Sequence, residues 1–487
     1  MKLLSSLSCK PAAIAALLVP ALFLLPNCQA LARETSDPFD TGSSMPPKPA
    51  LHMEGAVGDP CAAKPLDHAL NLAEVVNLAL CNNPQTHVAW ANSLAQAAQV
   101  GVSEAAYLPG VDLNAADDRT SGTAPTLNQL SVGVTFSYLL YDFGSRSANL
   151  ENARQLLAAA NATQDSTVQS VFLAAVQDYY LVQANQAALD AALESERAAK
   201  ESLAAAEARY NAGSATPADK LQAQTAYSQA TLNRITADGN LKNAQGTLAN
   251  MLGLDANRYV PLSPANTVAM PKDFEGDINA LIEQARKHRP DLQAVAAQVK
   301  AAEASADAAR AAGRPTISLT ATSNKYYTSD INSNSSLVGI NLSVPIFSGF
   351  DTTYRVRSAE AQVDVKNAQL EQMRLQVALD VWTAYQRLNT ATQSLRTTAV
   401  LLDSAEQSER VALGRYKAGV GSILDELNAL SALASARQQN IQSTFDWNIS
   451  RAALARAMGN LGAGLLPILL DSTSQQTIEN NIQNQQP

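Results

Sequence analysis

Bulky aromatic side chains are scarce in this sequence. Of its 487 residues only 5% are Phe, Trp or Tyr, although 46% are hydrophobic. Long stretches consist instead of Ala, Gln, Leu, Ser, Asn and Glu, which are mostly helix formers with few bulky core groups. A compact globular protein of this length normally has more large side chains. The composition therefore favours an elongated, mainly helical molecule.

Residue patterns that carry catalysis are also missing. There is no HExxH pair, no cysteine pair at zinc spacing and no GxxxxGK phosphate loop, and Gly419-Val420-Gly421 lacks the third glycine and the preceding strand of a dinucleotide loop. The histidines are scattered, at His52, His68, His87 and His288. We therefore expect no enzymatic activity, no cofactor and no metal, so energy for any transport must come from a partner. The net charge of -9 also argues against nucleic acid as a partner.

A long apolar run occurs only near the N-terminus. Lys2 and Lys10 accompany the apolar segment Ala12–Leu25, and Ala30-Leu31-Ala32 is a small-x-small cleavage site. Residues 1–32 are therefore predicted to be a cleaved signal peptide, because the run is shorter than the roughly 20 residues of a spanning helix. No other segment of the sequence approaches a spanning helix, so a membrane would have to be crossed by strands.

Cysteine occurs only four times. Cys9 and Cys28 lie in the signal region, where an uncleaved anchor and a lipoprotein at Cys28 are alternatives to cleavage. Cys61 and Cys81 remain, and an even pair in an oxidising compartment predicts one disulfide that ties the N-terminal segment to the first helix. Such a loop contributes about 3 kcal/mol in the chain-entropy model. Two unpaired buried thiols are the alternative.

The sequence does contain an internal repeat with a constant shift of 206 residues. The run Arg209-Tyr210-Asn211-Ala212-Gly213 matches Arg415-Tyr416-Lys417-Ala418-Gly419. Other pairs at the same shift are Pro84 with Pro290, Pro109 with Pro315, Tyr179 with Tyr385, Asp219 with Asp425, Leu221 with Leu427, and Gly253 with Gly459. One shift that persists without an insertion indicates a duplicated unit rather than two unrelated helical domains.

Each repeat has the same predicted plan. A helix over about 70–107 or 277–312 ends at a proline and is followed by a short alternating segment. A polar loop and a second alternating segment follow, over 130–141 or 336–347, with apolar residues at every second position. A soluble sheet is the commoner origin of such alternation. The signal peptide and the absence of another core for the sheet favour strands whose apolar side meets lipid.

Long helical patterns follow the second strand of each repeat, over 145–212 and 351–418, on the order of 100 Å each. Apolar residues of the first recur every seven positions in two stripes, which begin at Val168 and Phe172. Two stripes predict packing against two neighbours. A turn and a returning helix complete a hairpin in each repeat. An isolated antiparallel coiled coil would explain these helices but not the strands.

Four strands per chain are too few to close a barrel, since about eight are needed. The predicted fold is therefore mainly α with a small membrane β part and a two-fold internal repeat. Long α-helical hairpins would form a trimeric α-barrel, and four strands per chain a shared twelve-stranded β-barrel. The predicted segments are a signal peptide (1–32), a Pro/Ser-rich segment (33–64), repeat 1 (65–260), a linker (261–276), repeat 2 (277–462) and a polar tail (463–487).

Several short motifs occur in a fixed order along roughly residues 65 to 465. They are Asn83-Pro84 near the start of this range, Leu108-Pro109 before a strand, Tyr141-Asp142-Phe143-Gly144 and Ile346-Phe347-Ser348-Gly349 at strand-to-helix junctions, and the two Arg-Tyr-x-Ala-Gly turns. In this order they resemble the TolC family of outer-membrane efflux and secretion channels. The resemblance implies a homotrimeric channel in the outer membrane of a Gram-negative cell that spans the periplasm. It also implies a periplasmic adaptor protein, an inner-membrane transporter and outer-membrane lipid as partners, and no catalytic residues.

The resemblance further implies a gate at the hairpin tips. Asp425 resembles the family aspartate of an acidic constriction ring, and Asn428 stands where some members have a second aspartate. Tyr416 and Asp219 resemble positions that tie neighbouring hairpins shut, and Gly421 replaces an arginine that some members use there. Asp219 and Asp425 are alternatively helix caps or first-turn carboxylates, and the two roles can coexist. The tip turns themselves contain Arg209, Tyr210, Gly213, Arg415 and Gly419.

The leading hypothesis is a passive export conduit, either for efflux of small molecules or for type I secretion of proteins. The alternative is a periplasmic adaptor or coiled-coil scaffold, since those proteins also carry long helical hairpins. Adaptors usually have one hairpin within a soluble β-rich body, whereas two hairpins alternate with strands in this sequence.

Overall fold

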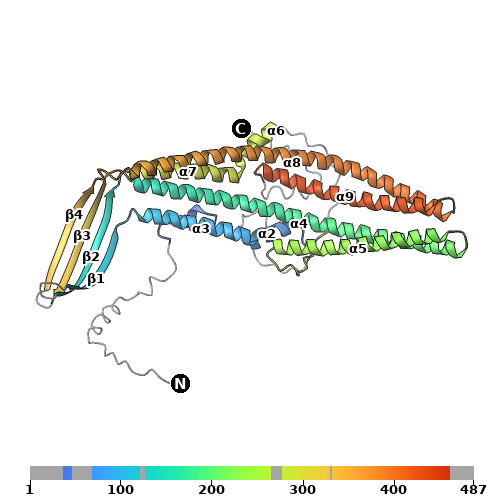
Figure 1. Cartoon of the computed structure of the whole chain (residues 1–487), viewed down its shortest axis with the longest axis horizontal. Helices are drawn as coiled ribbons and strands as arrows, with labels where there is room; N and C mark the ends of the chain where they lie inside the picture. The colour runs from blue at the N-terminus through green and yellow to red at the C-terminus, as the bar shows by residue number, and fades with distance from the viewer. Residues whose placement is uncertain (1–36, 47–67, 121–126, 265–276, 329–331, 461–487) are drawn as a thin grey trace, which may run out of the picture.

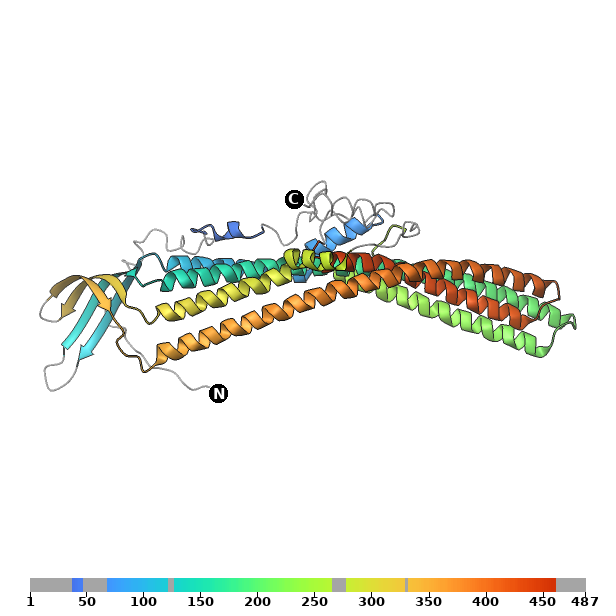
Figure 2. The same ribbon diagram turned by 90° about the horizontal axis from the view of Figure 1, so that it is seen from above.

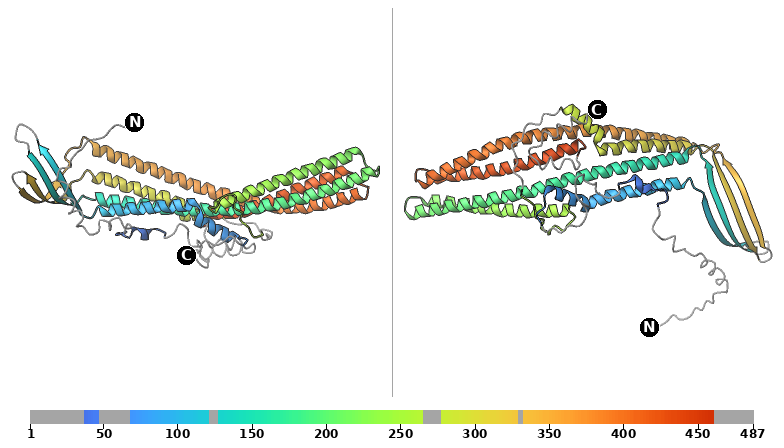
Figure 3. Two further views of the ribbon diagram at one scale, coloured as in Figure 1. Left: turned by 90° about the horizontal axis from the view of Figure 1, so that it is seen from below. Right: turned by 180° about the vertical axis from the view of Figure 1, so that it is seen from behind.

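The chain is an elongated, mostly helical molecule with a small sheet at one end and two hairpin tips at the other (Figures 1 and 3). The computed structural model describes residues 37–46, 68–120, 127–264, 277–328 and 332–460. The predicted signal peptide and C-terminal tail lie outside these ranges. Long helices run between the two ends, so the sheet and the tips are joined by continuous helix.

The two repeats have the same order of elements. Repeat 1 contains α2 (Leu72–Asn82), α3 (Pro84–Ala105), β1 (Gly110–Thr120), β2 (Leu127–Tyr141), α4 (Ser145–Asn211) and α5 (Pro217–Met251). Repeat 2 contains α6 (Ile278–His288), α7 (Pro290–Ala311), β3 (Thr316–Thr328), β4 (Asn332–Ser343), α8 (Asp351–Lys417) and α9 (Ile423–Ala457). Each helix of repeat 1 begins and ends 206 residues before its counterpart in repeat 2. A short 3-10 helix, η1 (Thr41–Ser44), precedes both repeats and packs on α3.

The single helix predicted before each strand pair is wrong, because two helices occupy each of these stretches. The break falls at Asn83 in repeat 1 and at Arg289 in repeat 2, where ψ is 127° and 120°. Both residues precede a proline, whose ring disfavours helical geometry at the residue before it. Pro84 and Pro290 then start the next helix, where the missing N–H has no helical partner to lose.

The strands form one antiparallel sheet in the order β1-β2-β3-β4. β2 pairs with both β1 and β3, with Val134 opposite Leu113 on one side and Ser323 on the other. β4 ends at Ser343, earlier than the predicted end at residue 347. Pro345 explains the shortening, because it has no N–H to donate to a neighbouring strand. β1 and β4 are the two edges of the sheet.

The helices lie side by side in two different orders along the molecule. Near the sheet the order is α3-α4-α7-α8 (Figure 2), and near the tips it is α5-α4-α9-α8 (Figure 1). α8 therefore forms one edge of the layer along its whole length. The opposite edge is formed by α3 in one half and by α5 in the other.

The main core lies midway along α4, where both predicted apolar stripes are buried. Val168, Ala175 and Val182 of one stripe and Phe172 and Tyr179 of the other pack with α2, α5 and α9. This confirms that α4 has two sets of neighbours. A second cluster joins the middle of α8 to α6 and α9. Across the described ranges, no helix combines the length and the hydropathy that a membrane span needs.

Candidate functional site: the hairpin tips

Each long helix ends in a turn that needs a glycine. Gly213 follows α4 with a φ of 71°, and the backbone N–H of Ser214 donates to the carbonyl of Arg209 at 2.9 Å. In the second tip Gly419 has a φ of 77°, and the equivalent bond to the carbonyl of Arg415 is 3.0 Å. A positive φ carries no steric penalty at glycine. The hydrogen bond from the residue after the glycine satisfies a backbone carbonyl in the last turn of the helix. The Arg-Tyr-x-Ala-Gly repeats are therefore two copies of one helix-ending motif.

Each returning helix begins with a capping box. The N–H of Asp219 donates to Thr216 Oγ1 at 3.2 Å, and the N–H of Thr216 donates to Asp219 Oδ2 at 2.8 Å. In the second tip the N–H of Asp425 donates to Ser422 Oγ at 3.1 Å, and the N–H of Ser422 donates to Asp425 Oδ2 at 3.4 Å. Such boxes satisfy backbone donors that a helix start leaves free. Both aspartates thus act as first-turn capping residues within their own tips.

One contact joins the two tips through Arg209 of α4 and Tyr416 of α8. Arg209 Nη1 donates to the Tyr416 carbonyl at 3.1 Å, and its guanidinium lies 4.8 Å from the centre of the Tyr416 ring. Tyr416 is only 3% exposed, and its hydroxyl has no hydrogen-bond partner among the described residues. Burial raises the pKa of Tyr416, an effect that the positive charge of Arg209 opposes. Asp219 is near enough to influence this pKa.

A second contact between the tips involves a buried carboxyl that sequence reasoning missed. Glu426 of α9 is 1% exposed, and its Oε1 accepts a hydrogen bond from the Ser202 hydroxyl of α4. Its Oε2 has no hydrogen-bond partner in the part of the chain that the structure describes. A comparison of the two repeats could have pointed to this residue, because the position equivalent to Glu426 in the first tip is a lysine of opposite charge, Lys220. Lys220 pairs instead with Glu207 at 3.2 Å, in a solvent-accessible position.

The surface joining the two hairpins near their tips is defined by three pairs, and we call it the hairpin seam. Besides Ser202 with Glu426 and Arg209 with Tyr416, it includes Ala199 and Leu430, which share one buried cluster. Small side chains at positions 199 and 202 allow α4 and α9 to approach closely. Every pair contributes one residue from each repeat, so the seam is the place where one hairpin is fixed to the other.

The remaining predicted tip residues lie outside the seam. Asp425 and Asn428 are exposed on α9, three residues apart, and Tyr210 and Arg415 are also exposed. Gly421 lies against the backbone of the preceding turn, where an added Cβ would be 3.0 Å from Arg415 Cβ. A side chain at position 421 would therefore force the turn to shift.

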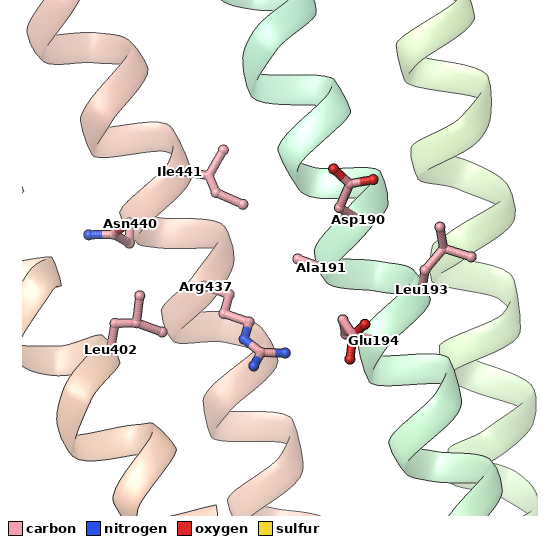
Figure 4. Close-up of a pocket in the computed structure, with 8 residues that line it drawn as sticks. All are labelled: Asp190, Ala191, Leu193, Glu194, Leu402, Arg437, Asn440 and Ile441. Atoms are coloured by element: carbon pink, nitrogen blue, oxygen red, sulfur yellow. The ribbon is translucent and has the colours of Figure 1, made fainter. Parts of the chain in front are cut away.

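Farther from the tips, the two hairpins are separated by an open groove of about 470 Å³ (Figure 4). Its walls come from α4 on one side and from α8 and α9 on the other, and the lining residues are Asp190, Ala191, Leu193, Glu194, Leu402, Arg437, Asn440 and Ile441. Arg437 also lies 3.9 Å from Glu406 of α8. Contact between the hairpins is thus interrupted between the central core and the hairpin seam.

Of the two cysteines predicted to form a disulfide, only Cys81 lies within the described residues. Cys81, in α2, is buried and disulfide-bonded. Cys61 lies outside the described residues, so its pairing with Cys81 stays a prediction.

The geometry defines a protein of duplicated strand-and-hairpin architecture, and comparisons with known proteins agree. The model of the family described as "Outer membrane efflux protein" matches the chain twice, over residues 75–254 and 281–460. Protein CyaE of Bordetella pertussis is 32% identical over 86% of this chain and 91% of its own length. Outer membrane protein TolC of Vibrio cholerae is 25% identical over 81% of this chain and 91% of its own length.

A solved structure shows the same fold. The CmeC outer membrane channel of Campylobacter jejuni superposes with a TM-score of 0.74, covering 89% of this chain and 98% of that channel at 20% identity. This chain therefore belongs to the outer membrane efflux protein family. The predicted fold class is confirmed as a mainly helical, two-fold repeated chain with four antiparallel strands. The relative from Vibrio cholerae is an outer membrane protein, and the superposed structure is that of an outer membrane channel.

Proposed function

We propose that this chain is the outer-membrane component of a tripartite export system and acts as a passive conduit for small molecules or secreted proteins. The observation that carries the proposal is the pair of open edges that runs the length of the molecule. The sheet ends at β1 and β4, and the helical layer ends at α8 on one side and at α3 and α5 on the other. Unpaired strand edges present free backbone donors and acceptors, which favour pairing with another chain.

Both helical edges expose apolar side chains on one face of the helix. On α5 these are Leu221, Leu232 and Ile235, and on α8 they include Leu375, Leu379 and Trp382. The spacing within each set places its members on a single stripe. A stripe left in water at each edge favours head-to-tail association, in which the α8 edge of one copy meets the α3 and α5 edge of the next.

Three copies joined in this way would supply twelve strands, enough for a closed barrel, whereas the four strands of one chain are too few. β4 exposes Leu337, Val338, Ile340 and Leu342, and strands of a membrane barrel present apolar residues to lipid. α4 alone has 67 residues, on the order of 100 Å of helix. A homotrimer would therefore form an outer-membrane barrel continued by a long helical tunnel into the periplasm.

The partners in this proposal are a periplasmic adaptor protein and an inner-membrane transporter. The chain contributes a passage and no catalytic step, so energy comes from the transporter, which also selects the cargo. Export through a cleaved signal peptide at residues 1–32 completes the route. Two observations disfavour the alternative of an adaptor or scaffold. The chain belongs to the outer membrane efflux protein family, and it has two hairpins rather than one.

We place the gate at the hairpin tips. Three copies of the exposed Asp425, with Asn428 three residues farther along α9, would form an acidic constriction that favours cations. Tyr416 and Asp219 would hold neighbouring tips together when the duct is closed. Gly421 leaves no side chain for an ion pair at its position, so closure depends on other contacts.

Three measurements test the proposed function. Membrane fractionation should recover the protein in the outer membrane, and detergent extraction should yield a trimer. In planar lipid bilayers the purified trimer should conduct ions, with a preference for cations. Recovery as a soluble periplasmic monomer would contradict the conduit and support a scaffold instead.

A further inference from the structure

Glu426 is buried in the hairpin seam, and within the described part of the chain only one of its two carboxyl oxygens is hydrogen-bonded. Oε1 accepts the hydrogen bond from Ser202, and Oε2 is without a partner among the described residues. A carboxylate that loses water and gains only one hydroxyl donor is poorly stabilised, because the charged form needs more compensation than the neutral form. The local geometry therefore suits the protonated carboxyl better than the carboxylate.

The charged groups around Glu426 come from several elements and largely oppose one another. From α8, Glu409 disfavours the carboxylate, whereas Lys417 favours it. Tyr416, also on α8, interacts electrostatically with Glu426 and with Arg209 of α4 and Asp219 of α5. From α4, the Ser202 hydroxyl donates a hydrogen bond to Oε1, which lowers the pKa of Glu426. Burial outweighs these influences and raises the pKa of Glu426.

The two hairpins can separate at the seam without disrupting the core. The groove lined by Asp190, Glu194 and Arg437 interrupts the contact between the hairpins on the side of the seam that faces the central core. The main cluster around Phe172 and Val176 lies beyond this groove, farther from the tips on α4. Losing the seam would therefore free the end of one hairpin relative to the other while the middle of the molecule stays packed.

We propose that Glu426 is a proton-dependent latch between the two hairpins of one chain. Protonated, it bonds Ser202 and holds the tips together, and ionised, it favours their separation and hydration of the carboxylate. The consequence for gating rests on the proposed function, because the tips are then the entrance of the duct. The latch itself is a contact within one chain and exists whether or not the assembly conducts.

The direction of the pH effect follows from proton binding. When the tips are closed, Glu426 retains its proton to a higher pH than an exposed glutamate does. Between the two pKa values the closed state binds more protons than the separated state, so raising the pH favours separation. Low pH should favour the closed tips, and the effect should level off above the raised pKa.

The latch can be tested by the distance between the tips in the full-length protein. Spin labels at Ala212→Cys and Ala418→Cys, two equivalent and exposed positions, report the separation of the hairpins within one chain when labelled copies are diluted with unlabelled ones. The distance distribution is recorded from about pH 5 to about pH 8, a range that includes raised carboxyl pKa values. Bilayer conductance is measured in parallel on the unlabelled protein.

The tip distance should lengthen as the pH rises in the native protein. It should stay short at every pH in Glu426→Gln, whose amide is neutral and can still bond Ser202. Glu201→Gln, which changes an exposed carboxylate beside Ser202, should retain the native pH dependence. A native distance that does not change with pH, or a Glu426→Gln variant that opens like the native protein, would overturn the latch. Absence of conductance with an intact distance change would instead count against the proposed function.

Discussion

The guanidinium of Arg209 lies 4.8 Å from the centre of the Tyr416 ring and donates a hydrogen bond of 3.1 Å to the Tyr416 carbonyl. Each residue belongs to an Arg-Tyr pair, Arg209-Tyr210 in the first repeat and Arg415-Tyr416 in the second. The first copy uses its arginine and the second copy its tyrosine, so one duplicated motif supplies both halves of a contact. Two sequences related by duplication have thus acquired different roles at the tips.

Replacing Arg209 with alanine should loosen the tips. The variant loses a charged hydrogen bond and a cation–π contact to the buried Tyr416, and because Arg209 itself is half-buried we expect a net loss of about 1–2 kcal/mol. That loss corresponds to a roughly five- to thirtyfold higher ratio of open to closed tips. Single-channel recording would show it as more frequent opening.

Arg410→Ala is the matched control for this experiment. Arg410 is exposed on α8, and its Nε donates to the carbonyl of Glu406 in the same helix at 3.2 Å. Equal opening frequencies in the two variants would show that Arg209 does not hold the tips together.

Asp425→Asn should weaken the cation preference of the conducting trimer. Asparagine removes the charge but keeps a side-chain oxygen that can still take part in the capping box with Ser422. Block by multivalent cations should fall as well, because the proposed ring would lack its three carboxylates. The complementary variant Asn428→Asp should strengthen both properties. If neither substitution changes cation preference or block, Asp425 is a capping residue without a role in conduction.

Two glycines of the second tip should respond oppositely to alanine. An added Cβ at Gly421 would meet Arg415 Cβ at 3.0 Å, so Gly421→Ala should destabilise the turn. Gly414 lies within α8 with open space around it, and alanine there should stabilise the helix by about 0.5–1 kcal/mol. Hydrogen exchange of the tip backbone would separate the two, with faster exchange in the first variant and slower exchange in the second. Equal exchange rates in the two variants would mean that the contact of the added Cβ with Arg415 does not destabilise the turn.

The sequence predicts the ends of the long helices well because their signals are local. The helix predicted over 145–212 is observed as Ser145–Asn211, and it ends where a glycine can adopt a positive φ. The breaks at Asn83 and Arg289 were missed although the following prolines mark them. Helix-forming residues stand on both sides of each break, and a proline disfavours helical geometry only at the residue before it.

The tip site was predicted only in part. The alternative roles of Asp219 and Asp425 as first-turn capping residues are confirmed by the two observed capping boxes. They could be predicted because a capping box involves only four consecutive residues. The bond between Ser202 and Glu426 joins residues 224 positions apart, and no local pattern encodes it. The nearest signal was the exchange of Lys220 for Glu426 between equivalent positions of the repeat.

Cross-linking between β1 and β4 would show whether three copies close edge to edge. Leu113→Cys and Ile340→Cys place thiols on opposite edges of one sheet, three strand spacings apart and four residues out of register, or roughly 20 Å. With a bis-maleimide too short for that span, reaction joins different copies only. A closed ring of three copies should give a ladder that stops at the trimer in outer-membrane preparations. A ladder that continues beyond three copies, or protein that remains monomeric, would contradict it.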